Sequence, residues 1–363
     1  MDGTTRGVTG DGPGPILVPM HARQLATLLL LLCACTDAPA PAERPDESPA
    51  GAGSQAPVPP ATDDAEADPA PSGSTPSTAE ADDSSSELPP ASSDAAVDGA
   101  ALPPALADAF EIVDDAPQSH GDREVPLALQ HRATGLVFVY VPGGSFTLGS
   151  DADDEKRFDD ERPPRRVRVT GFYLSVTETT WAAWKRGGGT DGAAPADDHP
   201  VNGVTWYQAR DWCDANGLSL PTEAQWEYAA SGPTDNLYPW GHDPFVKGRA
   251  NAAGTNDVDL WSQSSPVDSF PDGTAWCGAA DMAGNVMEWC LDGWTPDHTD
   301  VEPDTLDPLI APEEEQPRLE RLVRGGSYQS DALAHLRCAY RYSIAPNLAG
   351  GNLGFRAVVP RFQ

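Results

Sequence analysis

The chain has 363 residues with 56 acidic and 23 basic side chains, so its formal net charge is −33. Proteins that bind a nucleic-acid backbone need clustered lysines and arginines, and this balance argues against nucleic acid as a partner. The charge is uneven: residues 36–125 hold 20 acidic and 2 basic residues, whereas residues 126–363 hold 34 and 19. Nearly all the aromatic residues lie in the second part, which predicts one folded domain over residues 126–363.

Residues 20–35, MHARQLATLLLLLCAC, have the pattern of a bacterial lipoprotein signal peptide. Their apolar region, residues 25–32, is too short to span a bilayer as a permanent helix. The last four residues resemble the lipobox, in which the cysteine is lipidated, so Cys35 is the predicted lipidation site. An ordinary signal peptide cleaved nearby is the alternative. Both predict export, and the lipid form predicts a membrane anchor, with the domain facing the periplasm or the cell exterior.

Two further segments are not expected to fold. Residues 1–19 have no apolar run or charge pattern, and we interpret them as an upstream misreading of a chain that starts at Met20. Residues 36–125 contain 15 prolines and few aliphatic residues, so they cannot bury enough apolar surface to offset their chain entropy. We expect a disordered acidic tether there, with at most a brief helix over residues 104–113.

The patterns in the domain predict a loop-rich α+β fold. Thr205 and Thr222 are each followed three residues later by glutamine, a capping-box pattern that predicts the start of a helix. The first helix should end at residues 216–217, Asn-Gly. Periodicity fades after residue 241, so mostly loops with short strands are expected from there on. Strands are predicted over residues 136–141, 146–148, 166–169 and 172–174, with the last two in one sheet.

Seven short motifs follow one another along this domain. They are FTLG (146–149), PV with VTW (200–206), LPTEAQWEYAA (220–230), YPWG (238–241), DMAGNVMEW (281–289), RGGSY (324–328) and NLGFR (352–356). In this order they resemble the formylglycine-generating enzyme family, also called sulfatase-modifying factors. The resemblance implies a C-type-lectin-like fold with few short helices and strands, and with calcium sites. In the best-known members it also implies an oxidase that converts the cysteine of a C-x-P-x-R motif to formylglycine with O₂ and copper(I).

Calcium binding is expected both from the types of residue present and from the family resemblance. Calcium takes hard oxygen ligands, and loops supply them by mixing carboxylates with backbone carbonyls. The resemblance implies one site with side-chain oxygens from Asp281 and Glu288, and a second with side-chain oxygens from Asn251 and Asp259. The alternative is a turn whose acid pairs with an arginine such as Arg324 or Arg337. Backbone carbonyls would complete the sites, from Gly284 and Val286 in the first and from Ala252 and Trp261 in the second.

The copper loop departs from the pattern of the family. Copper(I) prefers two thiolates, and the family's enzymes place the first cysteine two residues after the Ser-Tyr pair, here Ser327 and Tyr328. That position is Ser330. The partner position is His335 when counted five residues forward, or Leu333 when counted back from Arg337-Cys338, so neither alignment supplies a cysteine. Met287 also replaces a tryptophan that lines the pocket in the family. Copper is therefore not expected as a cofactor, and Ser330 with His335 as a nucleophile and base, or as an altered metal pair, stays open.

The domain has four cysteines, which become disulfide candidates once the chain is exported. In the family, the equivalent of Cys213 can pair with the position of Ala357, and that of Cys338 with a position near Ala230, so any bonds here must be rewired. Cys277 and Cys290 flank the predicted calcium loop and could tie it down. Cys338 is interpreted as a structural cross-link rather than a catalytic residue.

Other chemistries have less support in this sequence. The histidines are isolated from one another, whereas a zinc site needs closely spaced His and Cys. The chain has neither the extra helical domain nor the His-x3-His-x-Glu element of the related iron-dependent sulfoxide synthases. Ser327 does not lie in a G-x-S-x-G motif, so a hydrolase triad is not indicated.

Two functions remain from the sequence. The first is a non-catalytic module on an envelope lipoprotein that binds a peptide, glycan or partner protein, with residues 187–199 and 295–318 as its variable surface. The second is a formylglycine-generating oxidase with an altered active site. The resemblance favours the first because family enzymes act on sulfatases before these fold, and an exported copy would meet them too late.

Overall fold

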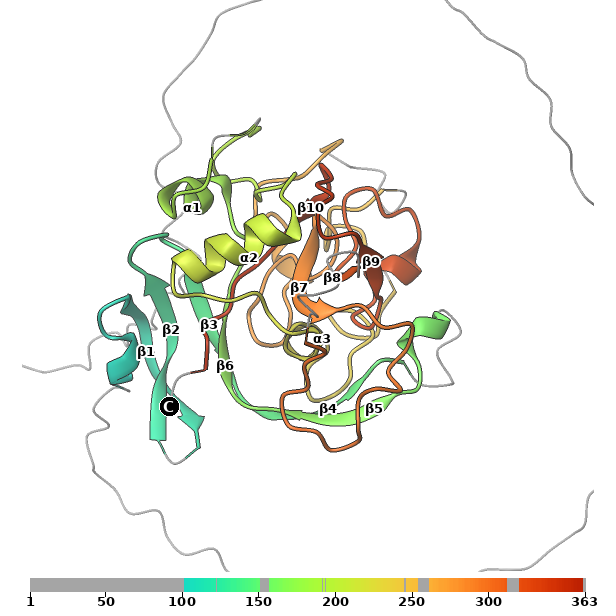
Figure 1. The fold of residues 1–363 in the computed structure, drawn as a ribbon, viewed down its shortest axis with the longest axis horizontal. Helices are drawn as coiled ribbons and strands as arrows, with labels where there is room; N and C mark the ends of the chain where they lie inside the picture. Colours follow the sequence, from blue (N-terminus) through green and yellow to red (C-terminus); the bar gives the residue numbers. More distant parts are fainter. Residues whose placement is uncertain are drawn as a thin grey trace, which may run out of the picture. The chain divides into compact units, whose positions relative to one another are not determined.

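The computed structural model describes residues 101–121, 123–150, 157–190, 192, 194–244, 246–253, 261–311 and 320–361 (Figure 1). The predicted signal peptide with Cys35, the residues before it and the tether up to residue 100 lie outside this part. Within the described residues, none of the helices has the length and apolar character needed to cross a membrane.

The first sheet has the strand order β1–β2–β3–β6, and all its neighbours are antiparallel. Its first hairpin corrects the boundary predicted for the tether, because the folded part includes residues from 101 onward and not only from 126. Leu106, Phe110 and Val125 are buried in the largest hydrophobic cluster, so this acidic segment still contributes an apolar face. The elements are η2 (Pro104–Leu106), β1 (Phe110–His120), β2 (Arg123–His131), β3 (Val137–Val141) and β6 (Phe172–Ser175).

A separate two-stranded sheet is formed by β4 (Gly144–Leu148) and β5 (Arg165–Val169), and η3 (Asp159–Glu161) precedes β5. The predicted alternation of β5 is confirmed, since Val167 and Val169 are buried while Arg166 and Arg168 are exposed. The expectation that β6 continues the sheet of β5 is wrong. β5 pairs with β4, and after a break at residues 170–171 the chain runs on in the same antiparallel register, where β6 pairs with β3 in the first sheet.

Three helices follow, α1 (Trp181–Arg186), α2 (Trp206–Ala215) and α3 (Glu223–Ser231). Both predicted capping boxes are present. The side chains of Thr205 and Thr222 each accept a hydrogen bond from the backbone amide of the glutamine three residues later, and the glutamine side chain accepts one from the backbone amide of the threonine. The predicted end of α2 is also confirmed. The sequence did not predict α1, which is only six residues long.

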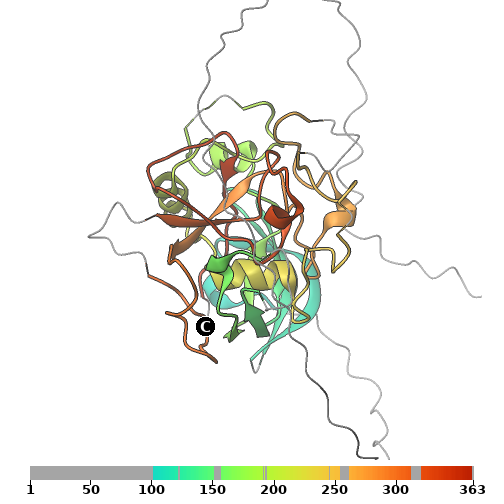
Figure 2. The same cartoon turned by 90° about the vertical axis from the view of Figure 1, so that its right-hand side faces the viewer.

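The C-terminal part forms a second four-stranded sheet in the order β10–β7–β8–β9 (Figure 1). Helix α2 packs on β7, and α3 contacts β4 and β5 as well as β7 and β8, so α3 joins the two-stranded sheet to the C-terminal sheet (Figure 2). The prediction of loops with short strands after residue 241 is confirmed. The elements are η4 (Pro271–Gly273), β7 (Met287–Gly293), β8 (Arg321–Arg324), η5 (Leu333–Leu336), β9 (Tyr342–Ile344) and β10 (Leu353–Gly354).

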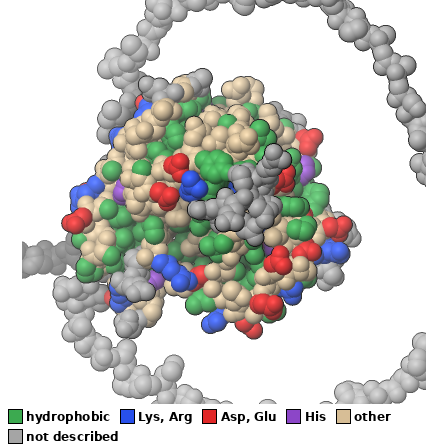
Figure 3. Space-filling model, viewed as in Figure 1, with side chains coloured by type: hydrophobic (Ala, Val, Ile, Leu, Met, Phe, Trp, Pro, Cys, Tyr) green, Lys and Arg blue, Asp and Glu red, His purple; other side chains and the backbone are tan. Residues whose placement is uncertain are grey.

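Figure 3 shows one face of the molecule, on which basic and acidic side chains are scattered among hydrophobic and uncharged ones. The basic side chains on this face do not gather into a large patch of the kind that a phosphate backbone requires.

Candidate functional site

The segment that resembles the copper loop begins with a tight turn on residues 325–326, two glycines whose φ angles are +90° and +67°. The Ser327 amide donates a hydrogen bond to the Ser330 hydroxyl at 3.0 Å, and the Ser330 amide donates to the Ser327 carbonyl at 2.9 Å. Next to them, the Tyr328 amide donates to the Asn285 carbonyl at 2.8 Å. The Ser330 hydroxyl therefore closes its own turn at the position where the resemblance implies a copper ligand.

The structure does not unite Ser330 and His335 as a nucleophile and base. No hydrogen bond joins them among the described residues, although an added Cβ on Gly326 would meet both the Ser330 hydroxyl and the His335 carbonyl. The His335 ring stacks on Phe158, with 6.0 Å between the ring centroids, and its Nδ1 lies 4.0 Å from the Asp331 carboxylate. His335 thus has the contacts of a partly exposed aromatic residue.

All four cysteines are free thiols, which overturns the predicted disulfides and the cross-linking role of Cys338. They lie in different places: Cys213 packs in the core around α2, whereas Cys290 and Cys338 pack in the cluster around α3. The Cys277 thiol donates to the Ala229 carbonyl at 3.4 Å. Burial raises the pKa of the Cys338 thiol well above its usual range, so this side chain is a protonated thiol at neutral pH.

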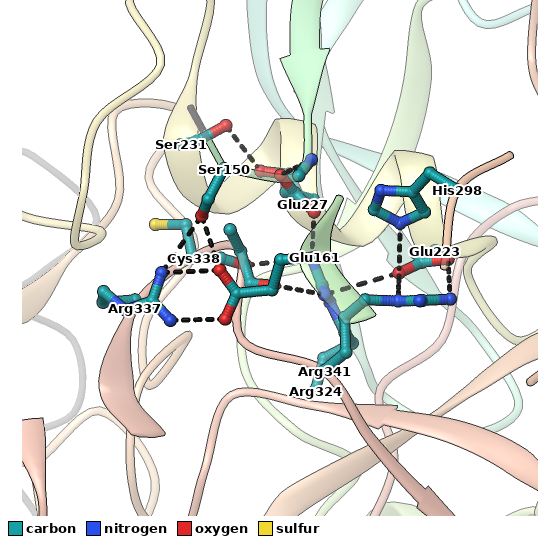
Figure 4. Close-up of polar contacts among 12 residues, drawn as sticks. Ser150, Glu161, Glu223, Glu227, Ser231, His298, Arg324, Arg337, Cys338 and Arg341 are labelled. Atoms are coloured by element: carbon teal, nitrogen blue, oxygen red, sulfur yellow. Dashed lines mark hydrogen bonds and ion pairs between the residues drawn. The ribbon is translucent and has the colours of Figure 1, made fainter. Parts of the chain in front are cut away.

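A network of buried ion pairs lies beneath the loop (Figure 4). Arg337 donates to both carboxylate oxygens of Glu161, and it also reaches the Ser150 hydroxyl at 3.1 Å. Both members of this pair are fully buried. Since Glu161 lies in η3 and Arg337 follows η5, the pair fastens the end of the loop to the segment between β4 and β5.

Two glutamates of α3 hold the other arginines of this network. Arg324 donates to Glu227, and Arg341 donates to Glu223 at 2.7 Å through its Nε. Although burial acts in the opposite direction, the charges of Arg341 and His298 hold the pKa of Glu223 well below its usual range. Three buried glutamates are therefore paired with three buried arginines. The arginines also donate to backbone carbonyls of loops, as Arg324 does to those of residues 338 and 339.

The loop predicted to hold the first calcium ion contains a different buried pair. Glu288 accepts from Nε and Nη2 of Arg356 at 2.6 and 2.8 Å, and also from the Trp226 indole at 2.7 Å. This matches the alternative in which an acid of the loop pairs with an arginine, but the arginine is Arg356 and not Arg324 or Arg337. The carboxylate that the resemblance assigns to calcium is thus already engaged by donors.

Other atoms of this loop still fit a cation. The Asp281 carboxylate accepts one hydrogen bond, from the Asp268 amide at 2.6 Å. The carbonyls of Gly284 and Val286 accept none of the loop hydrogen bonds in the described part of the chain. No group of three or more His, Cys, Asp or Glu side chains in that part is arranged to hold a metal ion. A ligand set of carboxylates and carbonyls is outside that criterion, so calcium at this loop stays a prediction.

The second predicted calcium site is only partly within the described residues. The Asn251 side-chain carbonyl is fully buried and has no hydrogen-bond partner, which suits a ligand oxygen. Ala252 next to it is buried, and Trp261 packs edge-on against Phe270 at 5.9 Å. Asp259 lies outside the described residues.

Sequence reasoning missed one residue beside the first loop. Glu178, between β6 and α1, is fully buried, and neither of its carboxylate oxygens has a hydrogen-bond partner. The sequence offered one weak signal, a glutamate that closely follows the apolar strand Phe172–Ser175. An acid beside a strand is usually exposed, so its burial could not be predicted without the fold.

Comparisons with known proteins agree with this arrangement. The family of sulfatase-modifying factor enzyme 1-like domains matches residues 126–361. The formylglycine-generating enzyme of Mus musculus is 29% identical over 295 residues, covering 64% of this chain and 75% of that protein. The inactive C-alpha-formylglycine-generating enzyme 2 of Bos taurus is 28% identical over 256 residues, covering 67% of this chain and 75% of that protein.

Among solved structures, PvdO from Pseudomonas aeruginosa matches with a TM-score of 0.55 and 22% sequence identity. The match covers 66% of this chain and 98% of PvdO. Identity at this level bears on the fold alone. The predicted loop-rich α+β fold of the C-type-lectin-like kind is confirmed.

Proposed function

The chain belongs to the sulfatase-modifying factor enzyme 1-like family, and on that premise we propose that its domain is a binding or structural module without copper-dependent cysteine oxidation. One observation carries this proposal. The loop position of the first copper ligand is Ser330, whose hydroxyl accepts a hydrogen bond from the Ser327 amide. A hydroxyl is a poor ligand for copper(I), which prefers soft thiolates.

The thiols of the domain offer no substitute for the missing pair. A cysteine must lose its proton to bind a metal, and burial opposes this by raising the pKa of Cys338 and of Cys290 well above the usual range. Cys338 is 2% exposed, so neither a metal nor a peptide reaches it without movement of the loop. The bovine relative is named an inactive member, so lack of activity has a precedent in this family.

The proposed ligand is a peptide, a glycan or a partner protein at the cell envelope. Cys35 would carry the lipid that anchors the chain, and the acidic segment after it would hold the domain away from the membrane surface. Residues 187–199 and 295–318 would supply the variable surface, because binding residues concentrate on loops that a rigid scaffold positions. Of these, residues 191, 193 and 312–318 lie outside the described part of the chain.

An incubation with a substrate peptide tests the central claim. The purified domain is mixed with a C-x-P-x-R peptide, copper(I) and O₂, and the peptide is weighed by mass spectrometry. We expect the cysteine peptide to keep its mass, because the loop lacks the thiolates that hold copper. A family enzyme that carries both copper cysteines, assayed in parallel, is the positive control.

The opposite result would establish the alternative function. If the peptide loses the mass expected when a CH₂SH group becomes an aldehyde, the domain is a formylglycine-generating oxidase with an altered active site. A Ser330→Ala variant then shows whether the altered loop takes part, since it removes the hydroxyl and leaves the backbone turn in place.

A further inference from the structure

A pocket of about 530 Å³ lies between helix α2, the segment after it, strand β7 and the start of β8. Cavities of about 300–1,000 Å³ are typical of sites for small organic ligands. Arg321, which lines this pocket, begins β8, whereas the glycine turn of the loop that resembles the copper loop follows the end of that strand. The pocket is therefore separate from the loop and from the ion pairs beneath it.

Helix α2 supplies a polar side to the pocket. Tyr207, Arg210 and Asp214 lie at positions i, i+3 and i+7, a spacing that places them along one side of a helix. The residues that α2 buries in the core include Ala209 and Trp212, which lie between them in sequence. Asp214 is exposed and Arg210 is partly exposed, so these two charged side chains border the entrance of the pocket.

Strand alternation brings a second arginine to the same pocket. Val323 packs in the core cluster around α2, whereas its neighbour Leu322 packs in the cluster around α3. Arg321, two residues before Val323, therefore lies on the α2 side of the sheet, as does Leu291 of β7. Arg321 is 2% exposed, so its guanidinium belongs to the deeper part of the lining.

Trp206 holds the two arginines close together. The Arg321 guanidinium carbon lies 4.8 Å from the centre of the Trp206 ring, and that of Arg210 lies 4.9 Å from it. An aromatic face attracts a cation, and the Trp206 indole is itself fixed by donating to the Cys290 carbonyl at 2.8 Å. Two positive charges therefore share one pocket in a chain whose net charge is −33.

The arginines favour a carboxylate as the ligand. Arg210 uses Nε and Nη2 on one oxygen of Asp211, at 2.9 and 2.6 Å, while its Nη1 makes no hydrogen bond to the described residues. Burial lowers the pKa of Arg321, and the charge of Arg210 acts in the same direction. An anion between the two guanidinium groups would relieve their repulsion. The planar fork of a guanidinium matches the two oxygens of a carboxylate.

The other polar groups of the lining favour hydroxyls on the same ligand. The Asp214 carboxylate can only accept hydrogen bonds, and sugar hydroxyls donate them. The Ser219 hydroxyl donates to the Leu220 carbonyl at 2.9 Å, so its oxygen remains an acceptor. An acidic peptide would bring further carboxylates towards Asp214, whereas a neutral sugar would give the arginines no charge to bind.

We propose that this pocket binds a uronic acid, a sugar with one carboxylate and several hydroxyls. Arg210 and Arg321 bind the carboxylate, Asp214 and Ser219 accept from hydroxyls, and Leu291 contacts the apolar part of the ring. The inference rests on the proposed binding role, to which it adds a class of ligand. Its test can fail independently of the peptide oxidation assay, because a domain with or without oxidase activity could bind a sugar here.

The test is a titration of the full-length protein, followed by ligand-observed NMR. The probes are galacturonate, glucuronate, galactose, acetate and N-acetylglutamate. We expect at least one of the two uronates to bind at least about tenfold more tightly than each of the other three, equivalent to about 1.4 kcal/mol. Galactose lacks the carboxylate, acetate lacks the hydroxyls, and N-acetylglutamate stands for an acidic peptide.

Two arginines changed in the same way show whether the pocket is the site. Arg210→Gln should weaken uronate binding at least about tenfold, equivalent to about 1.4 kcal/mol. The matched control is Arg249→Gln, which should bind like wild type. Arg249 also pairs with an aspartate, Asp243 at 3.0 Å, and lies 5.9 Å from the ring centre of Trp240, but it is outside the pocket. Circular dichroism verifies that both variants fold.

A conservative variant covers the case in which Arg210→Gln fails to fold. Arg210→Lys keeps the charge without the planar fork, so it should bind the uronate more weakly than wild type does. Wild type that binds neither uronate would overturn the proposal, and so would an Arg210→Gln or Arg210→Lys variant with wild-type affinity. Equal binding of acetate or of N-acetylglutamate would also overturn it, by showing a site for carboxylates in general or for an acidic peptide.

Discussion

Two regions of this domain bury several carboxylates each, and they differ in how many of these carboxylates have an arginine partner. Beneath the loop after β8, Glu161, Glu223 and Glu227 face three arginines, and Glu223 contacts two of them. Beside the loop before β7, one arginine faces Glu178, Asp281 and Glu288, and it pairs only with the last. The first region is balanced in charge, whereas the second is not.

The difference separates a structural network from a candidate ligand site. In the balanced region Arg341 and His298 hold the pKa of Glu223 below its usual range despite burial, whereas burial raises the pKa of Glu227 even beside Arg324. In the unbalanced region burial, with the charges of Asp281 and Glu288, raises the pKa of Glu178 well above its usual range. Carboxylates that are paired with arginines need no further counter-charge. These pairs also hold loops in place in a domain whose four cysteines are free. An unbalanced cluster calls for a partner from outside.

The largest effect is expected from breaking a balanced pair. Arg337→Ala should lower the free energy of unfolding by about 3–5 kcal/mol, because it leaves Glu161 buried without its partner. Urea unfolding measures the loss. The double variant Arg337→Met/Glu161→Leu removes both charges and should recover most of it. A single variant that costs less than about 1 kcal/mol would show that the pair is not a structural support.

The balanced region also predicts a dependence on pH, because it contains one further carboxyl. Burial, with a contribution from the charge of Glu223, raises the pKa of Asp292 from 3.8 to about 7. The folded state then holds a proton that the unfolded state has lost, so stability should fall as the pH rises from about 4 to about 7. Asp292→Asn should flatten this fall, measured by urea unfolding across that range. A variant whose pH profile runs parallel to that of wild type would refute the assignment.

Removal of a bound cation should distinguish the region with unbalanced charge from the balanced one. EDTA should lower the melting temperature of wild type, by an amount equivalent to about 2.7 kcal/mol if the ion was present at a hundred times its dissociation constant. Asp281→Ala should melt like wild type in EDTA and should not respond to Ca²⁺. Differential scanning calorimetry measures both. Equal melting of wild type in the two buffers would remove the calcium site from this loop.

The smallest effect is expected at the helix that serves both regions. Thr222 caps α3, which carries Glu223 and Glu227 on the balanced side and Trp226, the donor to Glu288, on the other. Thr222→Ala should cost about 1 kcal/mol, measured by urea unfolding, because one helix amide loses its acceptor. Thr222→Ser keeps the acceptor and should stay near wild type. A loss equal to that of Arg337→Ala would mean that the cap supports the ion pairs themselves.

Local patterns predicted the local parts of this structure. Both capping boxes, the end of α2 and the alternation in β5 depend on residues a few positions apart, and each is present. The hairpin of β1 and β2 escaped prediction because its composition is that of a tether, and its apolar side becomes visible only when Phe110 and Val125 meet the core. The disulfides failed for a similar reason, since a count of cysteines says nothing of how far apart the thiols lie.

The sequence by itself determined the family, through seven motifs in order, and the absence of a cysteine at position 330. It also contained every acid and arginine of the two buried regions, but it could not pair them. Glu161 and Arg337 are 176 positions apart, and Arg356 meets Glu288 across 68. Such partners come together only when strands and loops from distant parts of the chain pack. Which charges are neutralised by neighbours, and which are left for a ligand, is therefore decided by the tertiary structure.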